Sequence, residues 1–126
     1  MRSRILLIAP EDGFRHKVAG RLADAGLVVV TETDPDEAVR FLADKGANVV
    51  LFTASGTRDK DIALLHRLRN AAPSAAIIVL ETGSNVDFAM QARQSGVFDE
   101  VLMPFEFSEL LTKIEAAVAH VTRQGK

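Results

Sequence analysis

Small polar residues follow an uninterrupted apolar run in the middle of the chain. Residues 49–52 are all branched or aromatic, which is typical of a strand buried on both faces. Thr53 and Ser55 come directly after it, where hydroxyls and backbone amides can hold an anion. Glu81 follows a second apolar run, residues 76–80, and can act as a general base if burial raises its pKa. We nevertheless expect Thr53 to hydrogen-bond within its own loop and Glu81 to face solvent or pair with a neighbour.

The other residues that can carry chemistry are scattered. There is no cysteine, which excludes disulfides, thiolate metal sites and cysteine nucleophiles. His16, His66 and His120 fall on three separate helical segments without metal-ligand spacing, so we predict no metal site. No nucleophile stands beside a base in any way that the sequence reveals. We therefore expect a protein that is not an enzyme and that carries no cofactor.

Composition limits the class of protein. The 126 residues are enough for one domain, 1–126, with 122–126 as a polar tail that can begin a linker. No apolar run approaches the roughly 20 residues of a membrane helix. The short apolar run at 5–9 stops at Pro10 without a signal cleavage site. We therefore expect a cytoplasmic protein. Net charge is −2 with acids and bases interspersed, and Trp and Tyr are absent, which argues against direct nucleic-acid binding.

Apolar runs alternate with helical patterns along the whole chain. The expected strands cover residues 4–9, 27–31, 49–52, 76–80 and 100–103. Such alternation predicts a (βα)5 flavodoxin-like fold, a doubly wound five-stranded parallel sheet with strand order 2-1-3-4-5. This order puts a cleft between the carboxyl ends of strands one and three.

Two helices have readable details. Asp34, Pro35 and Glu37 predict a helix start, with Asp34 as the N-cap and Glu37 reaching back to the cap amide. The fourth helix is expected at about 85–95, with Ala89 and Ala92 toward the sheet.

The chain resembles the receiver domain of bacterial two-component response regulators. The order of elements, the acidic loop after the first strand, Gly96 at the end of the fourth helix and the pair Pro104 and Phe105 after the fifth strand carry this resemblance, which covers essentially the whole chain. It implies a domain of phosphorelay signal transduction. In this family a magnesium ion binds, and an aspartyl phosphate forms, at the carboxyl edge of the sheet.

The active-site groups that the family uses are missing at the matching positions. Where the family has two metal-binding acids after strand one, this chain has Ala9 and Pro10, and Thr53 stands in place of the phosphoacceptor Asp. The hydroxyl position after strand four is Glu81, and the Lys position before the Pro-Phe pair is Met103. The resemblance is therefore to a degenerate receiver, a pseudo-receiver, in which neither metal binding nor phosphorylation is expected.

An alignment shifted by one residue remains an alternative at the first strand. It would bring Glu11 and Asp12 to the metal-binding positions without supplying an Asp at the end of strand three. The nearest acids there, Asp59 and Asp61, are expected to cap the third helix or complement its dipole.

Two modes of action remain open. In the first, the protein binds a protein partner, a fused effector domain or a second copy through helix four, strand five and helix five. The interaction face would include Val86, Met90 and Glu100. Glu100 stands at the position that the family uses for its aromatic switch residue. In the second, the loops after strands three and four sense a small anion or nucleotide through Thr53, Ser55, Thr57, Thr82 and Ser84. The first of these loops also resembles the phosphate loop of flavodoxins, but it follows strand three instead of strand one, and no Trp or Tyr can stack on a flavin.

Overall fold

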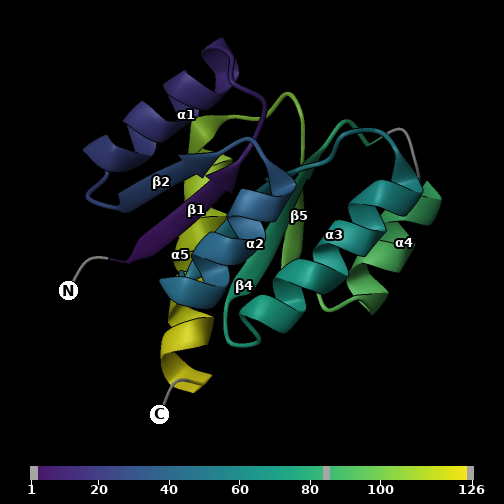
Figure 1. Ribbon diagram of the computed structural model, residues 1–126. Helices are drawn as coiled ribbons and strands as arrows, with labels where there is room; N and C mark the ends of the chain where they lie inside the picture. The colour runs from purple at the N-terminus through teal and green to yellow at the C-terminus, as the bar shows by residue number, and fades with distance from the viewer. Residues whose placement is uncertain (1–2, 84–85, 125–126) are drawn as a thin grey trace.

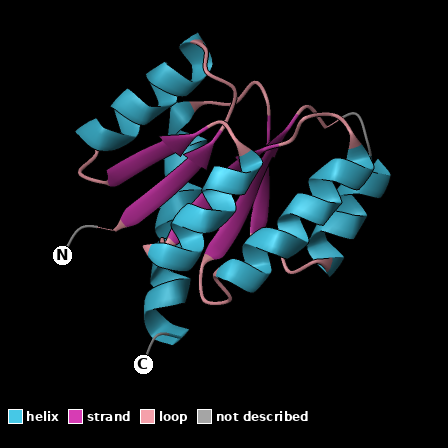
Figure 2. Cartoon of the chain, in the orientation of Figure 1, coloured by secondary structure: helices cyan, strands magenta, loops and turns pink. Residues whose placement is uncertain are grey.

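Strands and helices alternate in the three-dimensional structure (Figures 1 and 2). The computed structural model describes residues 3–83 and 86–124, and within them all side chains except those of 86, 87, 123 and 124. The elements are β1 Arg4–Ile8, α1 Gly13–Asp24, β2 Val28–Glu32, α2 Pro35–Asp44, β3 Val49–Thr53, α3 Arg58–Ala71, β4 Ala76–Glu81, α4 Val86–Gln94, β5 Asp99–Leu102 and α5 Phe107–Gln124.

The sheet of the described residues has five parallel strands in the order β2-β1-β3-β4-β5. This confirms the predicted flavodoxin-like order. β3 lies at the centre, with Val49 paired to Ile5 on one side and to Ala76 on the other. Because all strands run the same way, their carboxyl ends meet at one edge of the sheet, where open α/β folds bind ligands.

Two apolar layers enclose the sheet, because successive side chains of a strand point to opposite faces. Leu51 packs with residues of α1 and α5, whereas Val50 and Phe52 pack with residues of α2, α3 and α4. Figure 1 shows these two groups of helices on opposite sides of the sheet. The strand run that the sequence predicted to be buried on both faces is buried, since residues 49–52 are at most 3% exposed.

The start of α2 is partly as predicted. Asp34 is the N-cap, and its Oδ1 accepts a hydrogen bond from Asp36 N at 2.8 Å. The prediction for Glu37 is wrong, because the amide of Asp34 donates to Glu32 Oε1 at 3.3 Å, while Glu37 pairs with Arg40. The acceptor for the Asp34 amide is therefore Glu32, the last residue of β2, and not Glu37.

Several element bounds differ from the sequence prediction by one residue. β1 ends at Ile8, β5 begins at Asp99, and β4 extends to Glu81 because Glu81 pairs with Leu102 in the parallel ladder. β2 is an edge strand, so its side chains are less covered than expected, with Val28 39% exposed.

The two C-terminal helices also differ from the prediction. In α4 the side chains of Phe88 and Ala92 are buried, one turn apart, while Ala89 is only partly covered. α5 continues to Gln124, well into the segment 122–126 that was predicted as a polar tail.

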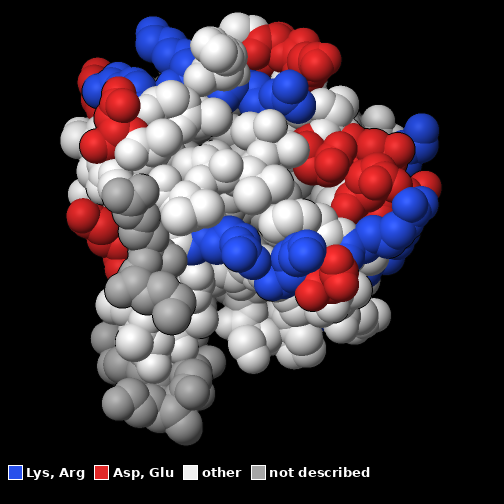
Figure 3. Space-filling model, turned by 60° about the vertical axis from the view of Figure 1, so that its left-hand side comes forward, with Lys and Arg blue, Asp and Glu red and all other residues white. Residues whose placement is uncertain are grey.

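Acidic and basic side chains surround an uncharged central area on the face shown in Figure 3, and acidic side chains gather on the right of this view. In the described part of the chain, no helix combines the length and the apolar character that a bilayer crossing requires.

Candidate functional site

Ala9, Pro10 and Thr53 lie together around one hollow at the carboxyl edge, between the ends of β1 and β3. The site therefore has the position that the resemblance implies. Ala9 is buried and Pro10 is exposed, and neither offers a side-chain oxygen. The Oγ1 of Thr53 is buried without a hydrogen-bond partner. The expectation that Thr53 hydrogen-bonds within its own loop is therefore wrong, since Thr53 is the last residue of β3 and its hydroxyl is buried there.

Glu11 and Asp12 do not join this hollow. Asp12 caps α1, its Oδ1 accepting from Arg15 N at 3.1 Å, and Glu11 pairs with the Arg15 guanidinium at 3.6 Å. Both acids line a separate hollow beside α1. The one-residue shift therefore brings no carboxylate to Thr53 in this structure.

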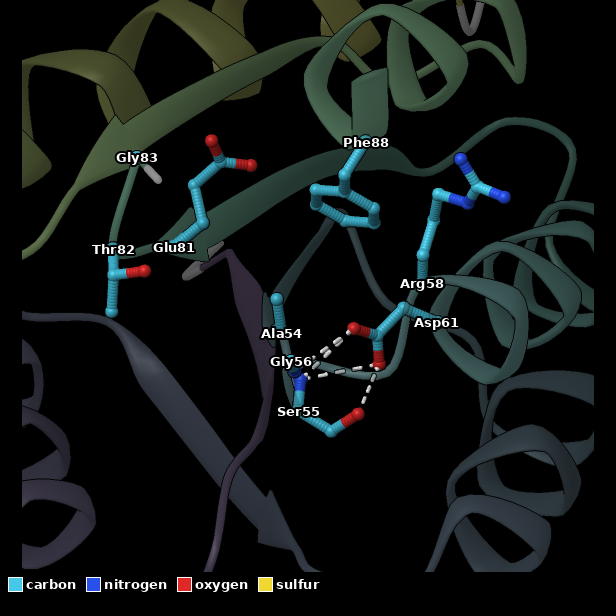
Figure 4. A pocket seen from close by; sticks show the side chains of 9 residues that line it. All are labelled: Ala54, Ser55, Gly56, Arg58, Asp61, Glu81, Thr82, Gly83 and Phe88. Atoms are coloured by element: carbon cyan, nitrogen blue, oxygen red, sulfur yellow. Dashed lines mark hydrogen bonds between the residues drawn. The ribbon is translucent and has the colours of Figure 1, made fainter. Parts of the chain in front are cut away.

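Asp61 is a buried carboxylate in the first turn of α3, at the helix start where the sequence placed it and Asp59 to cap the helix or complement its dipole. Its Oδ1 accepts from Ser55 N at 3.1 Å and from Ser55 Oγ at 2.7 Å, and its Oδ2 accepts from Gly56 N at 3.3 Å (Figure 4). The predicted capping role is wrong, because the carboxylate folds back onto the β3–α3 loop from the first turns of α3, and the N-cap residue Thr57 makes no side-chain cap bond. Asp59 remains on the surface, 3.6 Å from Arg58.

Glu81 is the second buried acid of the site. It is 6% exposed, and its Oε2 is buried without a hydrogen-bond partner. The expectation that Glu81 faces solvent or a pairing neighbour is wrong, because β4 runs one residue further than predicted and draws Glu81 into the sheet. Burial and, to a smaller extent, the carboxylate of Glu100 raise the pKa of Glu81 above its ordinary value.

The site continues across the sheet edge as a small pocket between the β3–α3 and β4–α4 loops. Asp61 and Ser55 line one side, Glu81 the other, and Phe88 lies between Glu81 and Arg58 (Figure 4). Thr82 also lines this pocket, whereas Ser84 lies outside the described residues. Both carboxylates therefore border the same pocket.

Met103 lies apart from this pocket. It is partly buried, it precedes a cis peptide bond to Pro104, and it lines an aromatic hollow with Phe105 and Phe14. The rings of Phe14 and Phe105 meet edge to face at 6.2 Å. The position that carries Lys in the family thus packs against aromatic rings, and the cations at this hollow, Lys17 and Arg21, belong to α1.

The predicted interaction face carries two exposed apolar side chains. Met90 is 57% exposed, as predicted, and Leu102, which sequence reasoning missed, is 54% exposed. Glu100 is half-buried, and its Oε1 accepts from Arg93 Nη2 at 2.9 Å. The side chain of Val86 lies outside the described residues. Leu102 could have been found from strand alternation, because it follows the buried Val101.

The histidines take part in local contacts. The ring of His120 lies 5.1 Å from that of Phe98, and His66 Nε2 is 3.4 Å from Ser95 Oγ. Among the side chains that the structure describes, no group of three or more His, Asp or Glu is arranged to hold a metal ion.

Comparison with known proteins gives relatives over nearly the whole chain. No protein-family model matches it. The DNA-binding transcriptional regulator NtrC of Salmonella typhimurium is 28% identical over 123 residues, which are 98% of this chain and 26% of the relative. NtrC of Proteus hauseri is 33% identical over the same shares of the two chains. The chain therefore spans about a quarter of the length of these curated relatives.

Solved structures give the same result. The receiver domain of NtrX from Brucella abortus superposes with a TM-score of 0.82 at 27% identity, covering 91% of this chain and 98% of that one. A CheY-like receiver domain protein of Methanospirillum hungatei has a TM-score of 0.90 at 16% identity, over 98% and 99% of the two chains, and this likeness concerns the fold alone.

Topology and similarity together define the chain as a response-regulator receiver domain, a signalling class and not in general an enzymatic one. Within that class, it is similar to the receiver parts of the NtrC and NtrX regulators.

Proposed function

We propose that this receiver domain signals without an aspartyl phosphate and acts through protein contacts. One observation carries the proposal: the hollow at the end of β3 has a threonine hydroxyl where the family has its phosphoacceptor, and it has Ala9 and Pro10 where the family has metal-binding acids. A hydroxyl is neutral, and an alanine and a proline have no side-chain oxygen. This chemistry supports a pseudo-receiver.

Electrostatics disfavour a phosphoryl group in the same place. Magnesium in proteins is held by carboxylates, waters and phosphate oxygens, and the residues around Thr53 that match the family's ligand positions contribute none of the carboxylates. A phosphoryl group carries close to two negative charges. Glu81, in the adjoining pocket, would add a third when ionised, and the apolar Met103 stands where the family has its Lys. Of the cations that line the hollow, Lys60 and Arg67, the second pairs with Asp36 at 2.8 Å.

The hydrogen bonds of Asp61 count against the alternative of an anion sensor. An anion at the β3–α3 loop would need the amides of Ser55 and Gly56, and the Asp61 carboxylate already accepts from both. An incoming phosphate would have to displace a buried, hydrogen-bonded carboxylate. We therefore place the sensor second.

The face formed by α4, β5 and α5 is the proposed contact surface. Met90 of α4 and Leu102 of β5 are exposed apolar side chains, and the Arg93–Glu100 and Lys113–Asp99 ion pairs join the same three elements. An apolar centre with a polar rim is the usual composition of a protein interface. The occupant would be a protein partner, a fused effector domain or a second copy, and the greater length of the relatives supports the fused effector. We place the activity in the cytoplasm, because relatives include DNA-binding regulators.

The test is phosphorylation by a small donor. The chain is incubated with acetyl phosphate and magnesium, beside a receiver domain with the complete set of active-site acids, and both are measured by intact-mass spectrometry. We expect the comparison protein alone to gain a phosphoryl group. Thr53→Asp is the matched variant, and it should also stay unmodified because the metal-binding acids and the Lys are still missing. A stoichiometric adduct on the unaltered chain would refute the proposal.

A further inference from the structure

Glu81 and Glu100 lie on adjacent strands and point to the same face of the sheet. The ladder pairs Glu100 with Val79, and Glu81 follows Val79 by two residues, so its side chain emerges on the same side. Strand spacing and rise put the two Cα atoms about 8 Å apart, a distance that two glutamate side chains can span. In Figure 4 the Glu81 carboxylate points away from that of Asp61.

Each of these carboxylates has an oxygen that is buried and unpaired. The Oε2 atoms of Glu81 and Glu100 have no hydrogen-bond partner, and Glu81 as a whole is 6% exposed. Two ionised carboxylates can only accept hydrogen bonds, so neither can satisfy the other. One added proton changes this, because a neutral carboxyl group can donate and carries no charge to desolvate.

The nearby cations of α4 and α5 contact Glu100 or Asp99. From α4, Arg93 Nη2 donates to Glu100 Oε1 at 2.9 Å, and the Arg93 side chain is 70% exposed. From α5, Lys113 Nζ donates to the carbonyl oxygen of Glu100 at 2.8 Å and to Asp99 Oδ1 at 3.3 Å. Each of these bonds stabilises β5, and none of them reaches Glu81.

The charged side chains of α3 that line this pocket, Asp61 and Arg58, do not pair with Glu81 either. Asp61 lines the same pocket but gives its carboxylate to the β3–α3 loop. Arg58 lies beyond the ring of Phe88 and pairs with Asp59. The sequence of α4 also contains Asp87, whose side chain lies outside the described ones, so it requires its own control.

We propose that Glu81 and Glu100 form a proton-binding switch beneath α4. With one proton on the pair, Glu81 stays buried as in this structure. When the proton passes to water, two carboxylates remain, one of them desolvated, and their repulsion drives Glu81 outward and shifts α4. No other bond is made or broken, and no co-reactant is needed.

The switch couples to the proposed output face. Glu81 ends β4, and the other member of the pair, Glu100, is bound to α4 by a hydrogen bond from Arg93 Nη2 to Glu100 Oε1 at 2.9 Å. Burial, and less strongly Glu100, raise the pKa of Glu81, so the proton leaves at a higher pH than from an ordinary glutamate. In this way a proton, instead of a phosphoryl group, would set the position of α4. The inference rests on the proposed function only in taking the face formed by α4, β5 and α5 as the contact surface.

The experiment is an NMR titration of the 126-residue chain, with glutamate side-chain carboxyl carbons and backbone amides observed from about pH 4.5 to pH 9. We expect Glu81 to titrate above ordinary glutamates and the amides of residues 86–94 to shift with the same midpoint. Glu100→Gln should move that midpoint to lower pH, because one repelling charge is gone. Glu81→Gln should abolish the shift of the α4 amides, whereas Asp87→Asn and the exposed control Glu115→Gln should leave it in place.

Two results would overturn the switch: Glu81 titrating with the ordinary glutamates, or α4 amides that move with an unchanged midpoint in Glu81→Gln. Failure of the proposed function is seen separately, since acetyl phosphate labelling involves neither Glu81 nor Glu100 as acceptor. A phosphorylated chain with a titrating Glu81 would refute that function and leave the switch standing.

Discussion

Replacing Asp61 by Asn tests how the β3–α3 loop is held. The carboxylate accepts from two backbone amides and one hydroxyl while nearly fully buried. A hydrogen bond to a charged group contributes about 1.5–3 kcal/mol, and an uncompensated buried donor costs about 1–3 kcal/mol. Asn keeps one acceptor oxygen but turns an amide group toward backbone donors. We therefore expect Asp61→Asn to lower the free energy of unfolding by about 2–3 kcal/mol.

The assay is urea unfolding at neutral pH, followed by circular dichroism. Asp59→Asn is the matched control, because Asp59 lies two residues away, is 92% exposed and takes part only in a surface ion pair. Such a change should stay within about 0.5 kcal/mol. If the two variants lose the same small amount, the carboxylate of Asp61 does not hold the loop and the argument from its hydrogen bonds fails.

The same residue predicts a gain of binding. Asp61→Ala leaves the amides of Ser55 and Gly56 without their internal acceptor. Inorganic phosphate should therefore raise the melting temperature of this variant more than that of the unaltered chain, since a ligand that binds only the folded state stabilises it. A phosphate response that is already full in the unaltered chain would show that Asp61 does not occupy the site.

Two further predictions concern Glu81 and the α4 face. The pKa of Glu81 is raised above 4.5 in the folded protein, so the stability that its proton contributes is complete below 4.5 and is lost as the pH rises through the raised value. In urea unfolding at about pH 8, Glu81→Gln should therefore be more stable than the unaltered chain by about 1–3 kcal/mol. The difference should be smaller at about pH 5. A stability difference that grows toward acid pH would contradict the predicted direction. If a second copy binds the face formed by α4, β5 and α5, light scattering after size exclusion should show that Met90→Asp weakens the dimer. Val28→Asp, on the opposite sheet edge, should not weaken it. If the unaltered chain and both variants are monomers, this face does not mediate self-association.

The fold was predictable because its signals are local. The apolar run at 49–52 and the cap at Asp34 depend on neighbouring residues, and both are found as predicted. The strand order follows from alternation of strands and helices, because parallel strands need crossover connections of one hand.

The site was predictable only in part, because its chemistry depends on contacts across the sheet. The sequence placed Ala9, Pro10 and Thr53 around one hollow correctly. It could not show that Asp61 folds back six residues onto Ser55, or that ladder pairing with β5 draws Glu81 inside. A carboxylate at the end of a strand is buried or exposed according to where its neighbour strand stops, and spacing along the chain does not contain that information.

Magnesium binding tests the central claim most directly. An isothermal titration of the chain with magnesium chloride, with amide NMR spectra of the same samples, measures whether the hollow between β1 and β3 holds a divalent ion. The two carboxylates that line this hollow are already engaged, Asp36 by Arg67 and Asp61 by Ser55, and the family's ligand positions offer none. We therefore expect no saturable heat up to about 10 mM metal and no shifts at Ala9, Thr53 or Ala54. Saturable binding with shifts at those residues would contradict the account.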